Sequence, residues 1–295
     1  MWPLNASGPL PALVMSVSPD TPFPRPGSAL DLALKTAGAH RPRLTAWAQW
    51  WHEISRIPYE VSDPAVGEKK LLWWQHAVAD AQGQPPQHPR LKALLGESTP
   101  PDWAPLPPAA CWSGQLQALQ DLLHQTRWLD SAGLQRHMQH STGLAVEGAA
   151  WILGVREPAA LAAARDLGVA LRKAHILTRV GQDAHAGWLH LPVDLLQQHG
   201  TKAHEWTRPA ADAPSEAMKQ LMRQWQQQTL ADLRDSLARL NQAAGAQRPA
   251  LRPLRVLTAL NVKLLEDLDA HDYQILRQRI SVGPWRKWFT AWRTR

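Results

Sequence analysis

The sequence of 295 residues predicts an all-α fold, built as one helical bundle. Three observations lead to this prediction. Apolar residues recur at helical spacing along most of the chain, strand-like alternation bounded by hairpin turns is missing, and the helix-favouring residues Ala, Leu, Gln and Arg are abundant. The clearest apolar stripes fall within residues 116–123, 161–171, 221–240 and 254–268. A chain of this length can bury a sizeable core within one large domain.

In chain order, the first predicted segment is a proline-rich flexible leader over residues 1–29, which has no basic region typical of a signal peptide. The all-α domain is predicted to cover residues 30–295. Breaks between helices are predicted at residues 82–89, 98–108, 207–214 and 242–253, because each is dense in Pro, Gly or small polar residues. Their lengths suit connections within one bundle rather than linkers between domains.

The composition limits the partners and the compartment. A formal net charge of +7 favours an anionic partner, which on charge alone is a diphosphate, an anionic membrane surface or nucleic acid. Most of the sixteen tryptophans fall in apolar helical stripes, which indicates core rather than base stacking, so no nucleic-acid partner is predicted. Cys111 is the only cysteine, which is typical of a reducing compartment, and we expect a cytoplasmic protein. The sequence contains no run of about 18 apolar residues, so no membrane-spanning helix is predicted.

Two stretches carry the most specific pattern. Residues 51–64 have the sequence W-H-E-I-S-R-I-P-Y-E-V-S-D-P, and K-L-L-W-W follows at residues 70–74. Residues 174–183 have the sequence A-H-I-L-T-R-V-G-Q-D, and the pattern continues to Leu191-Pro192. Both stretches have the spacing of a helix that presents polar groups on one face.

These stretches resemble the two aspartate-rich motifs of the squalene/phytoene synthase family. The family motifs usually read R-E-I-D-D-x-x-D-E-V-S-D-P and N-I-L-R-D-V-G-E-D-x-x-x-G-R-x-Y-L-P. Here Ser55, Arg56 and Tyr59 stand at the three Asp positions of the first motif. In the second motif Arg179 replaces the first Asp, while Asp183 is kept. The resemblance covers roughly residues 30–290 and implies an isoprenoid-synthase-type helical bundle around a central cavity.

The resemblance also implies a chemistry that these substitutions remove. Enzymes of the family join two prenyl diphosphates and use Mg²⁺ ions, held by the Asp-rich helices, to neutralise the departing diphosphate. An arginine in place of a carboxylate repels Mg²⁺ in a pocket of low dielectric constant. We therefore expect no metal cofactor and no catalytic residue at the motif positions. Pro58 is further predicted to kink or end the first motif helix near Ile57.

Two interpretations of the motif arginines stay open. In the first, Arg56 and Arg179 face each other across the old cavity and bind a diphosphate directly, with His175 and Arg127 as further candidates. In the second, they neutralise nearby acids: Glu53 and Glu60 lie within helical reach of Arg56, and Asp183 lies within reach of Arg179. The helical stripe of His175, Arg179 and Asp183 equally favours a retained polar cavity or a hydrogen-bonded network.

The C-terminal segment has a basic amphipathic pattern. One helical face carries four aromatic residues: Trp285, Trp288, Phe289 and Trp292. Four basic residues flank them: Arg286, Lys287, Arg293 and Arg295. Such a face suits a membrane interface, and a last helix packed on the bundle explains it equally well. The first alternative predicts a peripheral protein at the inner face of the membrane.

On function, the leading hypothesis is a non-catalytic family member that binds a prenyl diphosphate or another isoprenoid lipid, or that acts in assembly with a protein partner. Residues 134–154 and 191–200 also resemble the branch of the family that serves as a mitochondrial respiratory complex I assembly factor, which likewise lacks the Asp motifs. The alternative is an active farnesyl or geranylgeranyl diphosphate transferase, or one subunit of a heteromeric synthase.

Overall fold

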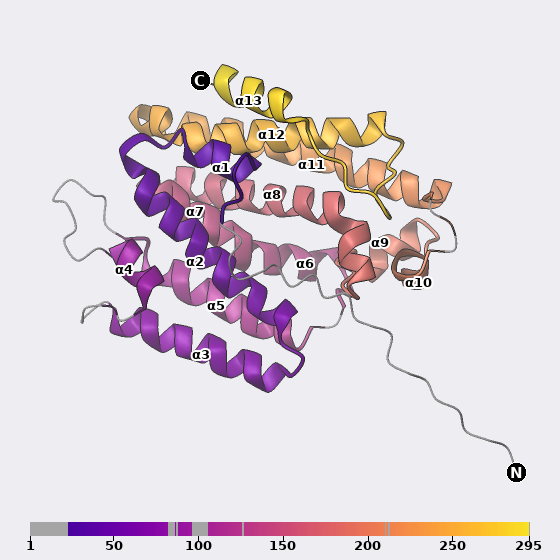
Figure 1. Cartoon of the computed structure of the whole chain (residues 1–295), viewed down its shortest axis with the longest axis horizontal. Helices are drawn as coiled ribbons and strands as arrows, with labels where there is room; N and C mark the ends of the chain where they lie inside the picture. The colour runs from indigo at the N-terminus through magenta and orange to yellow at the C-terminus, as the bar shows by residue number, and fades with distance from the viewer. Residues whose placement is uncertain are drawn as a thin grey trace, which may run out of the picture.

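The computed structural model describes residues 23–81, 86, 88–95, 106–125, 127–209, 211 and 213–294. Every regular element within these residues is a helix, so the predicted all-α fold is confirmed (Figure 1). The first half holds α1 Ala29–Leu34, η1 Gly38–His40, α2 Arg41–Glu60, α3 Pro64–Asp80, α4 Pro89–Leu95, α5 Ala109–Leu123, α6 Ser131–Met138, η2 Gln139–Gly143 and α7 Leu144–Ile152. The second half holds α8 Pro158–His185, α9 Val193–Gln198, α10 Ala203–Thr207, α11 Glu216–Ala243, η3 Gly245–Leu251, α12 Arg252–Ala270 and α13 Pro284–Arg293.

Local sequence signals set where several helices begin. Oxygen atoms of the Ser28, Asp63, Asp130 and Ser215 side chains accept hydrogen bonds from backbone N–H groups in the first turns of α1, α3, α6 and α11. Such capping satisfies donors that the helix itself leaves unpaired. Proline occupies the first turn of α2, α3, α8, α12 and α13, where its missing N–H costs nothing.

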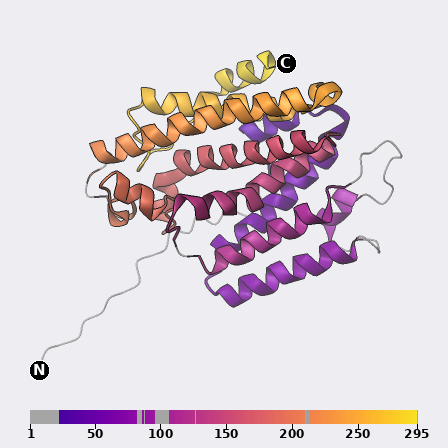
Figure 2. The same ribbon diagram turned by 180° about the vertical axis from the view of Figure 1, so that it is seen from behind.

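Helix α8 is the centre of the bundle. It packs most extensively along α11 and also contacts α7, η2 and α12 (Figure 1). Helices α2, α3 and α5 lie on the other side of the molecule from α11, α12 and α13, and Figure 2 shows the same order from behind. The main apolar core is continuous between these layers and includes the fully buried side chains of Trp50, Leu167 and Trp206.

Helices α6 and α7 form one continuous helix that is interrupted by a π turn, η2. This turn packs closely against α8 at Gly168, where a Cβ atom would lie 2.5 Å from the Thr142 carbonyl oxygen and 2.8 Å from the Gly143 Cα. Because those neighbours are backbone atoms, only glycine allows the two helices to approach this far. The close approach brings the end of α6 next to α8.

One predicted helix end needs correction. Helix α2 does not end near Ile57 but continues through Pro58 to Glu60, because the proline lies in the last turn, and the kink predicted as the other alternative stays a prediction. The leader over residues 1–29 also stays a prediction, and its residue Phe23 stacks on His52 with ring centroids 3.7 Å apart. Residues 1–22 lie outside the described residues.

The predicted breaks are partly confirmed. Residues 207–214 do connect α10 to α11, whereas most of the predicted break at 242–253 is the 3-10 helix η3. Much of the other two breaks, at 82–89 and 98–108, lies outside the described residues. Within the described ranges no helix is both long and apolar enough to cross a membrane.

Candidate functional site

The second motif places a row of polar side chains along α8. His175, Arg179 and Asp183 lie on one face of this helix, as their spacing predicts, and Arg172 continues the row by one more turn. Their neighbours in the sequence, Ala174 and Ile176 among them, are buried in the core. The row therefore forms one polar edge of an otherwise apolar helix.

Arg172 joins the two motif helices. Its Nη2 donates a hydrogen bond to the Tyr59 hydroxyl at 3.2 Å, across the space between α8 and α2. The Tyr59 ring in turn meets Trp188 edge to face at 4.8 Å and lies 5.9 Å from the His190 ring. Tyr59 therefore takes the place of a motif aspartate and accepts a hydrogen bond from an arginine there, where the family has a carboxylate that faces a metal ion.

Further polar groups face the same space from other elements. His137 on α6 and His190, which follows α8, are both within electrostatic range of Arg172. Arg279, in the connection between α12 and α13, acts on His175. We call the whole set the polar cluster: Tyr59, His137, Arg172, His175, Arg179, Asp183, His190 and Arg279.

The histidines of the polar cluster are neutral at pH 7. Burial, and secondarily the positive charge of Arg172, lowers the pKa of His190 to about 3 and the pKa of His137 to about 4. The same causes lower the pKa of His175 well below its usual value. A neutral imidazole offers one N–H donor and one acceptor, so these rings can hydrogen-bond a ligand without adding charge.

His175 is exposed to solvent, and desolvation by the protein around it, with the charges of nearby arginines, lowers the pKa of its imidazole. Burial also raises the pKa of Asp183, although Arg179 and Arg172 act in the opposite direction.

Arg179 and Asp183 form the ion pair that their spacing predicts, with 3.3 Å between Nε and Oδ1. Arg56 likewise pairs with Glu60. The predicted contact of Arg56 with Glu53 is absent, because Glu53 pairs instead with Arg90, at 3.0 Å. Within the described part of the chain, no interaction joins Arg56 to Arg179 or to the rest of the polar cluster.

The remaining sequence candidates lie apart from the polar cluster. The Ser55 hydroxyl donates to the backbone carbonyl of His52, at 3.3 Å, within α2. Arg127 is half-buried in the loop after α5, and its carbonyl oxygen accepts a hydrogen bond from the Gln125 side chain. Its chain neighbour Trp128 reaches the cluster, with its ring 4.9 Å from that of His137.

The residues at the motif positions do not fit the magnesium ions that the family uses. Ser55 and Tyr59 are neutral, Arg56 and Arg179 are cations, and the remaining carboxylate of Asp183 is already paired with Arg179. Among the described residues, no group of three His, Cys, Asp or Glu side chains is arranged to hold a metal ion. Mg²⁺ is held in proteins by oxygen ligands, often carboxylates, and a guanidinium at a ligand position repels it.

The connection between α12 and α13, residues 271–283, covers α8 at the second motif. A Cβ atom on Gly181 would collide with the carbonyl oxygens of Ile275 and Leu276, so the connection touches the helix backbone there. Its first residues, Asp272 and Tyr273, both have a positive φ, of 48° and 53°. The Asp272 carboxylate is held by Lys219 at 2.5 Å.

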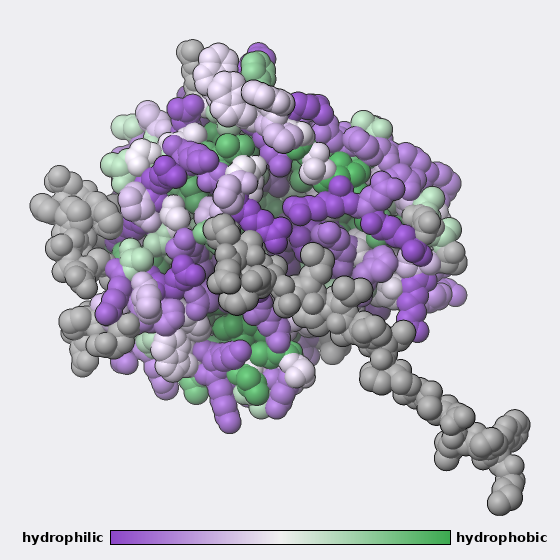
Figure 3. Space-filling model, in the orientation of Figure 1, coloured by the Kyte–Doolittle hydropathy of each residue, from purple (hydrophilic) through white to green (hydrophobic). Residues whose placement is uncertain are grey.

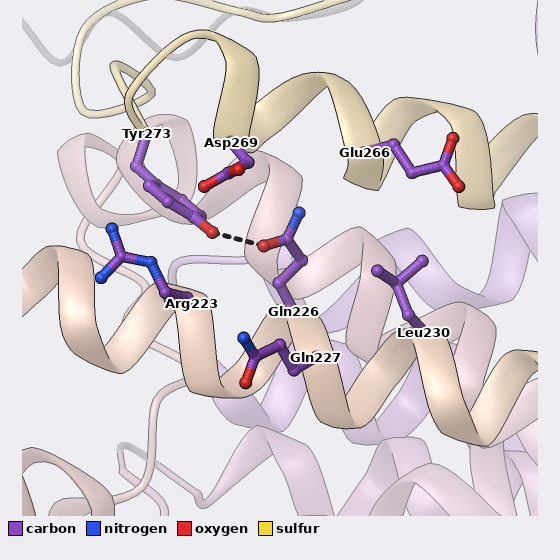
Figure 4. Close-up of a pocket in the computed structure, with 7 residues that line it drawn as sticks. All are labelled: Arg223, Gln226, Gln227, Leu230, Glu266, Asp269 and Tyr273. Atoms are coloured by element: carbon purple, nitrogen blue, oxygen red, sulfur yellow. Dashed lines mark hydrogen bonds between the residues drawn. The ribbon is translucent and has the colours of Figure 1, made fainter.

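Tyr273 fastens the same connection to α11. Its hydroxyl donates to Gln226 Oε1, and Gln226 Nε2 donates to the Leu265 carbonyl oxygen at 2.5 Å (Figure 4). These residues border an open pocket of about 310 Å³ between α11 and α12, which Arg223, Gln227, Leu230, Glu266 and Asp269 complete. The pocket lies outside the polar cluster, and a second, apolar one of about 220 Å³ lies beside Trp112.

The fold and the paired motif helices define an α-helical protein of the isoprenoid synthase type. The family model for squalene/phytoene synthase matches residues 33–286, so the chain belongs to the squalene/phytoene synthase family. The resemblance drawn from the two motifs is thereby confirmed.

Individual relatives agree with this placement. A crystal structure of a dehydrosqualene synthase in complex with ligand superposes with a TM-score of 0.75, at 15% identity, over 90% of both chains. The squalene synthase HpnC from Alicyclobacillus acidocaldarius superposes with a TM-score of 0.65, at 13% identity, over 82% of this chain and 88% of that one. A phytoene synthase from Cereibacter sphaeroides is 39% identical over 62 residues, which span 21% of this chain and only 18% of that relative.

Proposed function

We propose that this member of the family is a binding protein for an anionic isoprenoid, of the prenyl diphosphate class, and does not couple two such molecules. The polar cluster holds the anionic head, and apolar residues of the surrounding helices contact the prenyl tail. No metal ion takes part, because the motif positions carry cations and neutral groups where the family has carboxylates.

The charge of the polar cluster is the observation that carries this proposal. Three guanidinium groups, of Arg172, Arg179 and Arg279, act on the same histidine, His175, and one carboxylate, that of Asp183, opposes them. With the histidines neutral, the cluster has a net positive charge that suits a diphosphate. Guanidinium groups bind phosphate oxygens through charge-assisted hydrogen bonds, which are stronger than neutral ones.

Arg179 is the residue on which the test is built. When a diphosphate binds, the Arg179 guanidinium either leaves Asp183 and contacts the ligand or contacts Asp183 and the ligand together. Replacing Arg179 by alanine removes a charged donor, which costs about 1.5–3 kcal/mol and so weakens binding about 10- to 150-fold. Arg172→Ala is expected to have a comparable effect and also frees the Tyr59 hydroxyl.

Calorimetric titration of farnesyl and geranylgeranyl diphosphate, in the presence of EDTA, measures these affinities. Arg56→Ala is a matched control, because Arg56 also pairs with an acid four residues on but lies outside the cluster. We expect EDTA to leave wild-type binding unchanged and Arg56→Ala to bind like wild type. No binding by the wild-type protein, or equal losses in all three variants, would contradict the proposal.

The assembly role drawn from the resemblance to the complex I branch stays a prediction. No contact among the described residues bears on a protein partner. If the folded protein binds no prenyl diphosphate in the titrations, the assembly role becomes the better hypothesis for this protein.

A further inference from the structure

The C-terminal helix α13 presents its aromatic side chains to the solvent. Trp285 is 83% exposed, Trp288 55%, Phe289 51% and Trp292 63%. Figure 3 shows pale and green side chains gathered over α13 at the top of the molecule. Soluble proteins rarely expose a contiguous aromatic face of this kind unless it binds something.

The opposite side of α13 holds the helix on the bundle without using these aromatics. Ala291 is the buried residue of the helix, and it packs with Ala33, Val256 and Leu260 in a small separate core. Arg286 pairs with Asp267 at 3.1 Å, and Arg252 donates to the Thr294 carbonyl oxygen at 3.1 Å. The packed-helix alternative of the sequence therefore accounts for Ala291 but leaves the four aromatic residues unexplained.

Charge identifies the kind of surface that this face fits. Helix α13 carries Arg286, Lys287 and Arg293 and no acidic residue. Arg286 is neutralised by Asp267, whereas Lys287 and Arg293 form no ion pair within the described residues. Tryptophan rings prefer the headgroup level of a bilayer, and adjacent free cations are attracted to anionic lipids.

We propose that α13 docks the protein on the surface of an anionic lipid bilayer. The aromatic side chains enter the interface, Arg293 at the edge of the aromatic face contacts lipid phosphates, and Lys287, on the far side of the helix, adds to the positive potential of α13. Helix α13 lies along α12, with its axis over the bundle surface, so it can lie flat on a membrane while the rest of the domain stays in water (Figure 1).

Docking through α13 also orients the polar cluster. The connection of residues 271–283 leads directly from α13 back to α8, touches it at Gly181 and brings Arg279 to His175. The helix that contacts the bilayer, α13, is therefore directly joined to the segment of residues 271–283, which contacts the polar cluster. The docking proposal itself rests on α13 alone and holds whether or not the polar cluster binds a prenyl diphosphate.

Vesicle co-sedimentation of the full chain tests the proposal, with phosphatidylcholine vesicles that contain or lack 30% phosphatidylglycerol. The double variant Trp285→Ala/Trp288→Ala should lose at least about tenfold in partitioning to the anionic vesicles. Lys287→Gln/Arg293→Gln should lose about 30-fold on anionic vesicles at low salt and little on neutral ones. Both pairs of side chains are solvent-facing or partly so, and circular dichroism checks that the variants fold.

Helix α3 supplies a matched control at the far side of the bundle. It also exposes two apolar side chains, Leu72 and Trp73, next to the cations Lys69 and Lys70. Trp73→Ala and Lys69→Gln/Lys70→Gln should bind vesicles like wild type. The proposal is overturned if these controls lose binding as much as the α13 variants, if no variant differs from wild type, or if light scattering shows that α13 instead mediates a dimer in the absence of lipid.

Discussion

Arginine stands at two positions where the family has aspartate, and the two arginines have different surroundings. Arg56 pairs with Glu60 within one helix, apart from the polar cluster. Arg179 pairs with Asp183 and shares its space with two further arginines and His175. The sequence predicted both ion pairs, but it treated the two arginines as equivalent. Only the packing of other elements around α8 distinguishes them.

The same limit applies to the rest of the candidate site. His175, Arg179 and Asp183 could be predicted because helical spacing puts them on one face. Arg172, three residues before His175, obeys the same spacing and could have been found by extending the row. His137, His190 and Arg279 could not, because they come from three other elements and no local pattern relates them.

A pH dependence of stability follows from His190. Its pKa is lowered from 6.5 to about 3, first by burial and then by Arg172 and His137. Between these values the unfolded chain binds a proton that the folded protein does not, so folding stability falls as the pH drops below about 6.5. One such group contributes about 1.4 kcal/mol per pH unit over this window.

Urea unfolding of wild type and His190→Gln at several pH values from 7 down to 4.5 measures this effect. We expect the variant to lose stability less steeply on acidification, by about 1.4 kcal/mol per pH unit. His124→Gln is the control, because His124 is exposed and pairs with Glu68 at the surface. Parallel slopes for wild type and His190→Gln would show that folding does not lower the pKa of His190.

At the scale of elements, two close contacts hold the polar cluster in place, and both occur at glycines of α8, Gly168 and Gly181. Most helices and the break at residues 207–214 could be predicted from periodicity and turn residues. The end of α2 was predicted too early, because a proline in the last turn of a helix is tolerated. The contact of residues 271–283 with α8 was not predictable, since the spacing gives no sign of which loop covers a given glycine.

Gly181→Ala tests this contact. The added methyl group would meet the carbonyl oxygens of Ile275 and Leu276, so the connection must move and carry Arg279 away from His175. We expect a loss of roughly 1–3 kcal/mol in the free energy of unfolding, as for other overpacked sites, together with weaker binding of prenyl diphosphate.

Gly114→Ala is the matched control for this variant. Gly114 is also helical, but its added methyl group would meet only the end of the flexible Leu144 side chain, at 2.5 Å. Because alanine favours helix over glycine by up to about 1 kcal/mol, the control should stay within that range of wild type. Urea unfolding compares the two variants, and equal stability of both would argue against a tight contact at Gly181.

At the scale of the whole molecule, the family and the fold were predicted correctly from two motif stretches. The frame of each motif survives although the three aspartates at Ser55, Arg56 and Tyr59 and the first one of the second motif are replaced: Glu53, Glu60 and Asp183 remain, and Asp63 caps α3. Helix packing depends on the apolar positions between the motif acids, which are unchanged in character. Loss of the acids therefore leaves the bundle intact, whereas we expect it to remove the metal-binding chemistry.

This separation predicts the outcome of a turnover assay. Incubated with farnesyl or geranylgeranyl diphosphate and Mg²⁺, the protein should form no squalene, phytoene or cyclopropyl intermediate above a boiled control. The physical reason is the lack of carboxylates to hold Mg²⁺ against the leaving diphosphate. An active family enzyme assayed in parallel provides the positive control, and Mg²⁺-dependent product from this chain would refute the prediction.

The π turn at Gln139–Gly143 has a consequence for comparing this chain with its relatives. A π turn is a helix with one residue more than the regular spiral needs. A relative with an unbroken α-helix here aligns with this chain only through a one-residue gap inside the helix. Because the π turn takes up this extra residue within itself, deleting one residue from it would restore the regular spiral while α6 keeps its orientation against α7. His137 would then stay on the face on which it meets Arg172, so such a deletion should leave the polar cluster in place.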